Sequence, residues 1–235
     1  MDSFLKNYKN TIYKAVPKKY LSFIKDYIYF VELGLKASEN MNIKPEIKLK
    51  KFDLLYRQIF KNCALKNNLI SKLQNKFIEE NISLSLLSDM INIFKYKVTD
   101  SHFTNSASLN NYRQNFASVY ARLIMTLNDL SPSVYIPLVS AIMCTIIITQ
   151  EKNSNNNIER LDGLLKDAKI LPLIIKNNSF RFKSWYFIET LEILTTKYKQ
   201  GLSLKISNFN LIKIFVYASF KWLFVRVKTL KNRGI

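Results

Sequence analysis

The side chains that could carry out chemistry are few in this sequence. A single histidine, His102, follows Asp100 and Ser101, and the two cysteines, Cys63 and Cys144, lie in apolar stretches without a CxxC spacing. One histidine excludes a histidine-rich metal site and does not favour a Ser/His/Asp triad. The isolated cysteines argue against a disulfide framework or a zinc site. We therefore expect two buried thiols in a reducing compartment.

Two glutamates lie near the C-terminal ends of helices that the apolar pattern predicts. The run YFVELGLKASE, residues 29–39, has Glu32 and Glu39 as its only acids, and the run AIMCTIIITQEKNSNNN, residues 141–157, has Glu151 alone. A helix that binds magnesium through its side chains needs carboxylates on one face, which residues four apart provide. Neither run has acids at this spacing, and the acid nearest each helix end, Glu39 or Glu151, stands alone. The simpler interpretation is that both are solvated residues near helix ends.

Helices are the elements that would position these residues. Apolar residues recur at helical spacing, as in Phe52, Leu55, Tyr56, Ile59 and Phe60, and the chain has only four Gly and five Pro. We predict helices at residues 18–39, 47–62, 68–78, 83–98, 108–128, 134–152, 158–170, 180–199 and 208–230. The connectors are short and polar, which favours one all-α helical bundle spanning residues 1–235.

Two segments approach the hydropathy of a membrane span. Residues 134–149 are interrupted by Pro137, which leaves about twelve apolar or small residues, fewer than the ~20 that a spanning helix needs. Residues 211–225 contain Lys213 and Lys221, and each lysine is costly at the centre of a bilayer. We predict that both segments are core helices. The N-terminal MDSFLKNYKN is polar where a signal peptide would be apolar, so secretion is not indicated.

The chain is strongly basic. Its 36 Lys and Arg against 17 Asp and Glu give a formal net charge of +19, which is typical of proteins that bind nucleic acid or an anionic membrane surface. Nucleic-acid binders gather Arg and base-stacking aromatic residues on one stripe, whereas these lysines are scattered. We therefore predict no nucleic-acid partner. Lys, Asn and Ile are abundant together, so codon bias in an AT-rich coding sequence is an alternative source of the charge.

Aromatic residues and lysines alternate near the C-terminal side of the chain. Residues 213–224 read KIFVYASFKWLF, and residues 226–235 add two Arg and two Lys. This composition would suit the headgroup region of an anionic bilayer, so peripheral membrane contact is one hypothesis. The other is a core helix whose basic end complements the helix dipole. We favour the core helix for residues 211–225, and the role of the basic residues beyond it stays open.

The central part of the chain resembles the squalene and phytoene synthase family. The segment YRQNFASVYARL, Tyr112 to Leu123, has the family's Tyr, an Ala five residues on, a small residue four further and then Arg-Leu. Phe103 and Leu109 upstream, and the apolar residues 86–94, match the family's pattern as well. The resemblance extends thinly from about residue 15 to about residue 225. It implies an all-α bundle of the isoprenoid synthase type.

The resemblance also implies a reaction and its metal site. Members of this family join two prenyl diphosphates head to head, and two DxxxD motifs on facing helices hold the magnesium ions that grip the diphosphate. In this chain the motif ends fall on Leu35 and Glu39 and on Glu151 and Asn155, so one acid of each pair remains. The family's acid ahead of its Arg-Tyr pair falls on Lys97, which would repel Mg²⁺.

Because the chain differs from the family at these positions, two hypotheses for its function are open. The leading interpretation is a squalene/phytoene synthase-like pseudoenzyme without a cofactor, acting as an accessory or assembly factor, for which assembly of respiratory complex I is a special case. The alternative is an active Mg²⁺-dependent prenyltransferase of isoprenoid biosynthesis. In that case Glu39 and Glu151 are the residual metal ligands, while Lys36, Tyr112 and Arg122 contact the prenyl diphosphate.

Partners and location are expectations of the same kind. The partner would be a paralogous synthase subunit or an assembly target, with a prenyl diphosphate as candidate ligand. We expect a cytoplasmic protein, or one peripheral at the inner membrane, which in a eukaryote would place it in the mitochondrial matrix.

Overall fold

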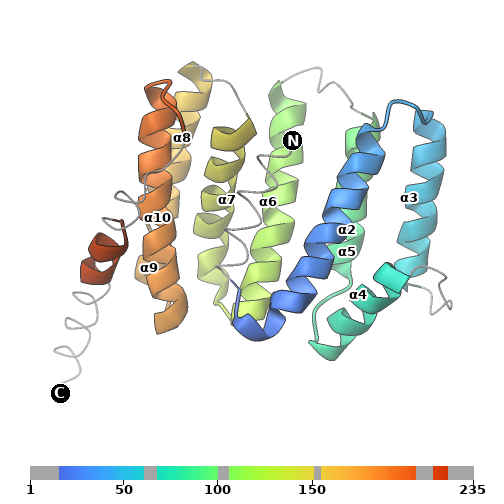
Figure 1. The fold of residues 1–235 in the computed structure, drawn as a ribbon, viewed down its shortest axis with the longest axis horizontal. Helices are drawn as coiled ribbons and strands as arrows, with labels where there is room; N and C mark the ends of the chain where they lie inside the picture. Colours follow the sequence, from blue (N-terminus) through green and yellow to red (C-terminus); the bar gives the residue numbers. More distant parts are fainter. Residues whose placement is uncertain (1–15, 61–67, 100–105, 151–154, 205–213, 222–235) are drawn as a thin grey trace. The chain divides into compact units, whose positions relative to one another are not determined.

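The computed structural model describes residues 16–60, 68–99, 106–150, 155–204 and 214–221, which form helices and short connectors (Figure 1). The predicted all-α class is therefore confirmed for the described residues. The isoprenoid synthase type of bundle stays a prediction. The described helices fall into two compact units that divide after Leu127, and we describe each unit by itself. The single domain expected over residues 1–235 also stays a prediction.

Among its described residues, the first unit contains one short 3-10 helix and five α-helices. They are η1 (Lys18–Tyr20), α2 (Leu21–Glu39), α3 (Pro45–Phe60), α4 (Asn68–Glu79), α5 (Ser85–Thr99) and α6 (Ser106–Asn128). Both α2 and α3 pack on α5 (Figure 1). The predicted ranges 18–39, 47–62, 68–78, 83–98 and 108–128 match these helices to within two or three residues.

Aromatic side chains form the core of this unit. Tyr27 of α2 packs edge to face on Tyr120 of α6, with ring centroids 5.8 Å apart, and Phe30 packs in the same manner on Phe94 of α5 at 5.7 Å. Phe52 of α3 also contacts Phe94, with ring centroids 5.6 Å apart. All five rings are buried. Such pairs add to the free energy gained by burial, so α2, α3 and α5 are fixed relative to one another.

The C-terminal end of α2 is held by a lysine of α3. Lys48 is buried, and its ammonium group donates a hydrogen bond to the backbone oxygen of Ser38 at 2.9 Å. The last carbonyl groups of a helix have no partner within the helix, and a cation there also complements the helix dipole. This contact fixes the helix end that carries Glu39.

The second unit is built around an apolar helix. Its elements are η2 (Pro132–Val134), α7 (Tyr135–Gln150), α8 (Asn155–Ala168), α9 (Leu171–Ile174) and α10 (Asn178–Lys199). Residues 214–221 form a further helical segment. The prediction separated the main helices correctly but did not include the four-residue α9, which follows α8 after a two-residue turn.

One cluster of buried side chains joins α7, α8 and α10. Ala141, Cys144 and Ile147 of α7 pack with Leu161 of α8 and Ile188 of α10. Within the described part of the chain, one window, residues 132–149, is long and apolar enough to cross a membrane, and 67% of it is buried inside the structure. The core helix of a folded domain passes the same test of length and composition. Burial of this extent agrees with the prediction that residues 134–149 are a core helix.

Candidate functional site

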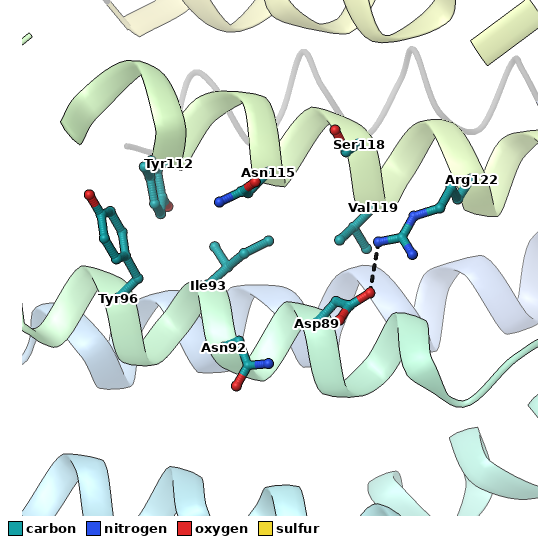
Figure 2. A pocket seen from close by; sticks show the side chains of 9 residues that line it. All are labelled: Asp89, Asn92, Ile93, Tyr96, Tyr112, Asn115, Ser118, Val119 and Arg122. Atoms are coloured by element: carbon teal, nitrogen blue, oxygen red, sulfur yellow. Dashed lines mark hydrogen bonds and ion pairs between the residues drawn. The ribbon is translucent and has the colours of Figure 1, made fainter. Parts of the chain in front are cut away.

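A cavity of about 410 Å³ lies between α5 and α6 (Figure 2). Each helix contributes a stripe of side chains at helical spacing, because residues three and four apart share one face. The lining residues are Asp89, Asn92, Ile93 and Tyr96 of α5, and Tyr112, Asn115, Ser118, Val119 and Arg122 of α6. The opposite face of α5 carries Leu87, Met90, Ile91 and Phe94, which are fully buried. The cavity therefore lies on the more polar face of α5.

An ion pair lies at one end of the cavity (Figure 2). The guanidinium group of Arg122 donates a hydrogen bond to the carboxylate of Asp89 at 2.7 Å (Figure 2). The side chains of Arg122 and Asp89 remain 42% and 37% exposed. The pair is thus open to water, and an anionic ligand would compete with Asp89 for Arg122.

A buried phenol lies close to this ion pair. The hydroxyl group of Tyr27 is buried and has no hydrogen-bond partner among the described residues. Burial raises the pKa of Tyr27, while the charges of Arg122 and Asp89 act on it in opposite directions. The phenol therefore stays neutral over the physiological range, and it is a donor rather than a base.

Two tyrosines form the other end of the cavity. Figure 2 shows the rings of Tyr96 and Tyr112 on the two sides of the cavity, one from each helix. The hydroxyl group of Tyr96 donates a weak hydrogen bond to the backbone oxygen of Ser108 at 3.4 Å. Burial, and to a smaller extent the charge of Glu39, raise the pKa of Tyr112, so this phenol is also neutral. The apolar side chains of Ile93 and Val119 lie between the two ends.

The lining combines an apolar centre with polar groups at both ends. An apolar centre with tyrosines at one end and an arginine at the other suits an elongated organic ligand that carries an anionic or polar group. The carboxylate of the lining residue Asp89 is engaged by Arg122, and the buried phenol of Tyr112 is neutral.

The structure brings two of the predicted substrate-binding residues together. Tyr112 and Arg122 line the same cavity from α6. Lys36 is exposed on α2 and does not belong to the lining. Sequence reasoning did not include Asp89 or Asn92, although their spacing with Tyr96 marks one face of α5 as more polar than the other.

The predicted metal ligand Glu39 has a different partner. Its carboxylate forms an ion pair with the ammonium group of Lys97, which joins the end of α2 to α5. The Lys97 ammonium group also lies 5.9 Å from the ring centroid of Tyr112. Glu151 lies outside the described residues. Within the described ranges no group of three or more His, Cys, Asp or Glu side chains gathers that could hold a metal ion.

Comparisons of the chain with protein-family models, with curated proteins and with solved structures found no match. The resemblance to squalene and phytoene synthases consequently depends on the residues between Tyr112 and Leu123 and on the helical pattern around them.

Proposed function

We propose that this chain is a non-catalytic accessory or assembly protein that resembles the squalene and phytoene synthases. The ion pair between Glu39 and Lys97 is the observation that supports this proposal most directly. Glu39 is the acid that remains at the first metal-binding position implied by the resemblance, and Lys97 occupies the position of another family acid. A cation is therefore already present at this carboxylate, and it is part of the chain.

The surroundings of Lys97 strengthen this argument. Its side chain is only 18% exposed, and its ammonium group contacts the Glu39 carboxylate and also lies 5.9 Å from the ring centroid of Tyr112. Mg²⁺ requires several hard oxygen ligands in an octahedral arrangement. To bind at Glu39 it would have to displace the ammonium group or share the carboxylate with it, and the two positive charges repel each other.

An active prenyltransferase remains the second candidate because Tyr112 and Arg122 line one cavity. The cavity combines an apolar centre with a guanidinium group, and a prenyl diphosphate combines an apolar chain with an anionic group. A ligand can, however, bind such a cavity without metal-assisted ionisation. The two candidates differ in their dependence on Mg²⁺.

The decisive measurement is release of diphosphate from farnesyl or geranylgeranyl diphosphate by the purified protein, with and without Mg²⁺. We expect no release above the protein-free control, and we expect binding of a fluorescent prenyl diphosphate to be unchanged by Mg²⁺. Mg²⁺-dependent turnover by the wild-type protein would overturn the proposal.

Two variants of one residue test the role of Lys97. Lys97→Asp restores an acid next to Glu39, so we expect it to bind Mg²⁺ more tightly than the wild-type protein in isothermal titration calorimetry. Lys97→Ala is the matched control, because it removes the lysine without adding a ligand, and a smaller gain is expected. Equal Mg²⁺ affinity in all three proteins would show that Glu39 is not part of a metal position.

The accessory role makes a separate prediction about the native protein. Affinity purification from the native source should recover this chain in a stable complex with a synthase subunit or an assembly intermediate. A chain that sediments as a free monomer in native extract would contradict this part of the proposal.

A further inference from the structure

Residues 214–221 leave an apolar face open to solvent. Phe215, Val216, Tyr217 and Phe220 are 54%, 45%, 52% and 69% exposed. The expectation of a core helix for residues 211–225 was therefore wrong for most of the described part of that segment, because Ile214 and Ala218 are the residues buried there. Four large apolar side chains exposed within one short helical segment are typical of an interaction surface.

Contacts at both ends hold the segment on α10, so the same side chains of the segment stay exposed. The ammonium group of Lys221 forms an ion pair with the buried carboxylate of Glu189 at 2.6 Å. It also lies 5.1 Å from the ring centroid of Trp185. At the other end of the segment, the ring of Phe215 packs edge to face on Phe182 at 5.7 Å.

The charge of the chain indicates which kind of partner binds this face. The protein carries a net charge of +19, so two copies repel each other and self-association through this face is disfavoured. Lys213 precedes the segment, and residues 222–235 contain two Arg, two Lys and no acid. Cations that flank an exposed aromatic and aliphatic segment in the sequence are complementary to a partner that is both anionic and apolar.

An anionic lipid bilayer has this combination of properties, and nucleic acid does not. The side chains of Val216 and Phe220 gain free energy when they leave water for a hydrocarbon environment, and Tyr217 suits the boundary between headgroups and acyl chains. A nucleic acid would contact the cations but would leave Val216 in water. We propose that the exposed face of residues 214–221 binds peripherally to the surface of an anionic bilayer. This inference does not depend on the proposed accessory function.

Flotation with vesicles tests the proposal. We expect the full-length protein to float with vesicles of phosphatidylcholine and phosphatidylglycerol, to bind pure phosphatidylcholine vesicles at least tenfold more weakly, and to lose affinity as salt is added. The double variant Phe215→Ser/Phe220→Ser should bind the anionic vesicles about tenfold more weakly than the wild-type protein, because two inserted side chains are lost. Circular dichroism should show unchanged helix content, since both substituted side chains are more than half exposed.

Phe60→Ser is the matched control. Phe60 is 56% exposed on α3, which belongs to the other compact unit, and its replacement should leave vesicle binding unchanged. Equal binding of the wild-type protein and the Phe215→Ser/Phe220→Ser variant would overturn the proposal, as would an equal loss in Phe60→Ser. If the double variant bound duplex DNA more weakly than the wild-type protein does, the face would be assigned to nucleic acid instead. If the wild-type protein sedimented as a dimer and the double variant as a monomer, the face would be assigned to self-association.

Discussion

The thiol of Cys144 shows how strongly the packing of α7 controls the chemistry of one residue. Cys144 is fully buried, and burial raises its pKa from 9.0 to about 12. The folded state holds this thiol neutral, whereas the unfolded state ionises it above its ordinary pKa of 9.0. The contribution of the neutral thiol to stability is therefore complete below pH 9.0 and is lost as the pH rises toward about 12.

This predicts the reactivity of a single-cysteine protein. In a Cys63→Ser variant, Cys144 should resist alkylation by iodoacetamide at pH 8 in native buffer and should react fully in denaturant. Mass spectrometry of the alkylated protein measures the labelled fraction. Rapid labelling without denaturant would mean that α7 opens far more often than its burial indicates.

At the same scale, Lys97 shows which contacts of the candidate site the sequence could predict and which it could not. Family positions and residue types indicated that Lys97 would oppose Mg²⁺ near Glu39. They could not indicate that Lys97 pairs with Glu39 itself, because a pairing between residues 58 positions apart depends on how α2 packs on α5. Tyr112 and Arg122, which the resemblance singled out, line the cavity, whereas Asp89 was not included because an acid on a predicted helix is usually a solvated residue.

Gly34 and Gly163 both lie in helices, but they differ in the space that is available for a Cβ atom. A Cβ atom at Gly34 would lie 2.1 Å from a ring carbon of Phe94, whereas nothing lies within 4 Å of a Cβ at Gly163. Alanine normally stabilises a helix by roughly 0.5–1 kcal/mol relative to glycine. At Gly34 the ring of Phe94 would have to move within a packed core, which costs about 1–3 kcal/mol.

We therefore expect Gly34→Ala to lower the free energy of unfolding by about 1–2 kcal/mol and Gly163→Ala to raise it by about 0.5–1 kcal/mol. Urea denaturation followed by circular dichroism measures both values. If Gly34→Ala proved as stabilising as Gly163→Ala, the close packing of α2 on α5 would be incorrect.

The existence and order of the main helices followed from the sequence because apolar spacing is a local property. Their exposed faces did not follow in every case. Residues 214–221 have the composition of a core helix, but only Ile214 and Ala218 are buried, since α10 covers one side of the segment. The hydrophobicity of a side chain alone does not tell whether a neighbouring helix buries it or whether it stays exposed.

At the scale of the whole molecule, the described helices divide into two units that each have a core. The aromatic core of α2, α3 and α5 belongs to the first unit, and the cluster of α7, α8 and α10 belongs to the second. The sequence predicted one domain because no long linker separates the helices. A short connector does not by itself make two compact units fold cooperatively, however.

We expect a fragment of residues 16–127 to fold by itself. Its far-ultraviolet circular dichroism should be helical, and its thermal unfolding should be a single cooperative transition. An unfolded fragment, together with one transition for the full chain, would favour the single domain that the sequence predicted.

The order of the helices along the chain has a consequence for synthesis in the cell. The side chains that cover α7 come from α8 and α10, which the ribosome adds afterwards. At about 5–20 residues per second, several seconds pass between translation of residue 150 and that of residue 199. Until α10 is complete, α7 lacks part of the apolar surface that later covers it, so chaperones that bind exposed hydrophobic segments can engage it during that interval.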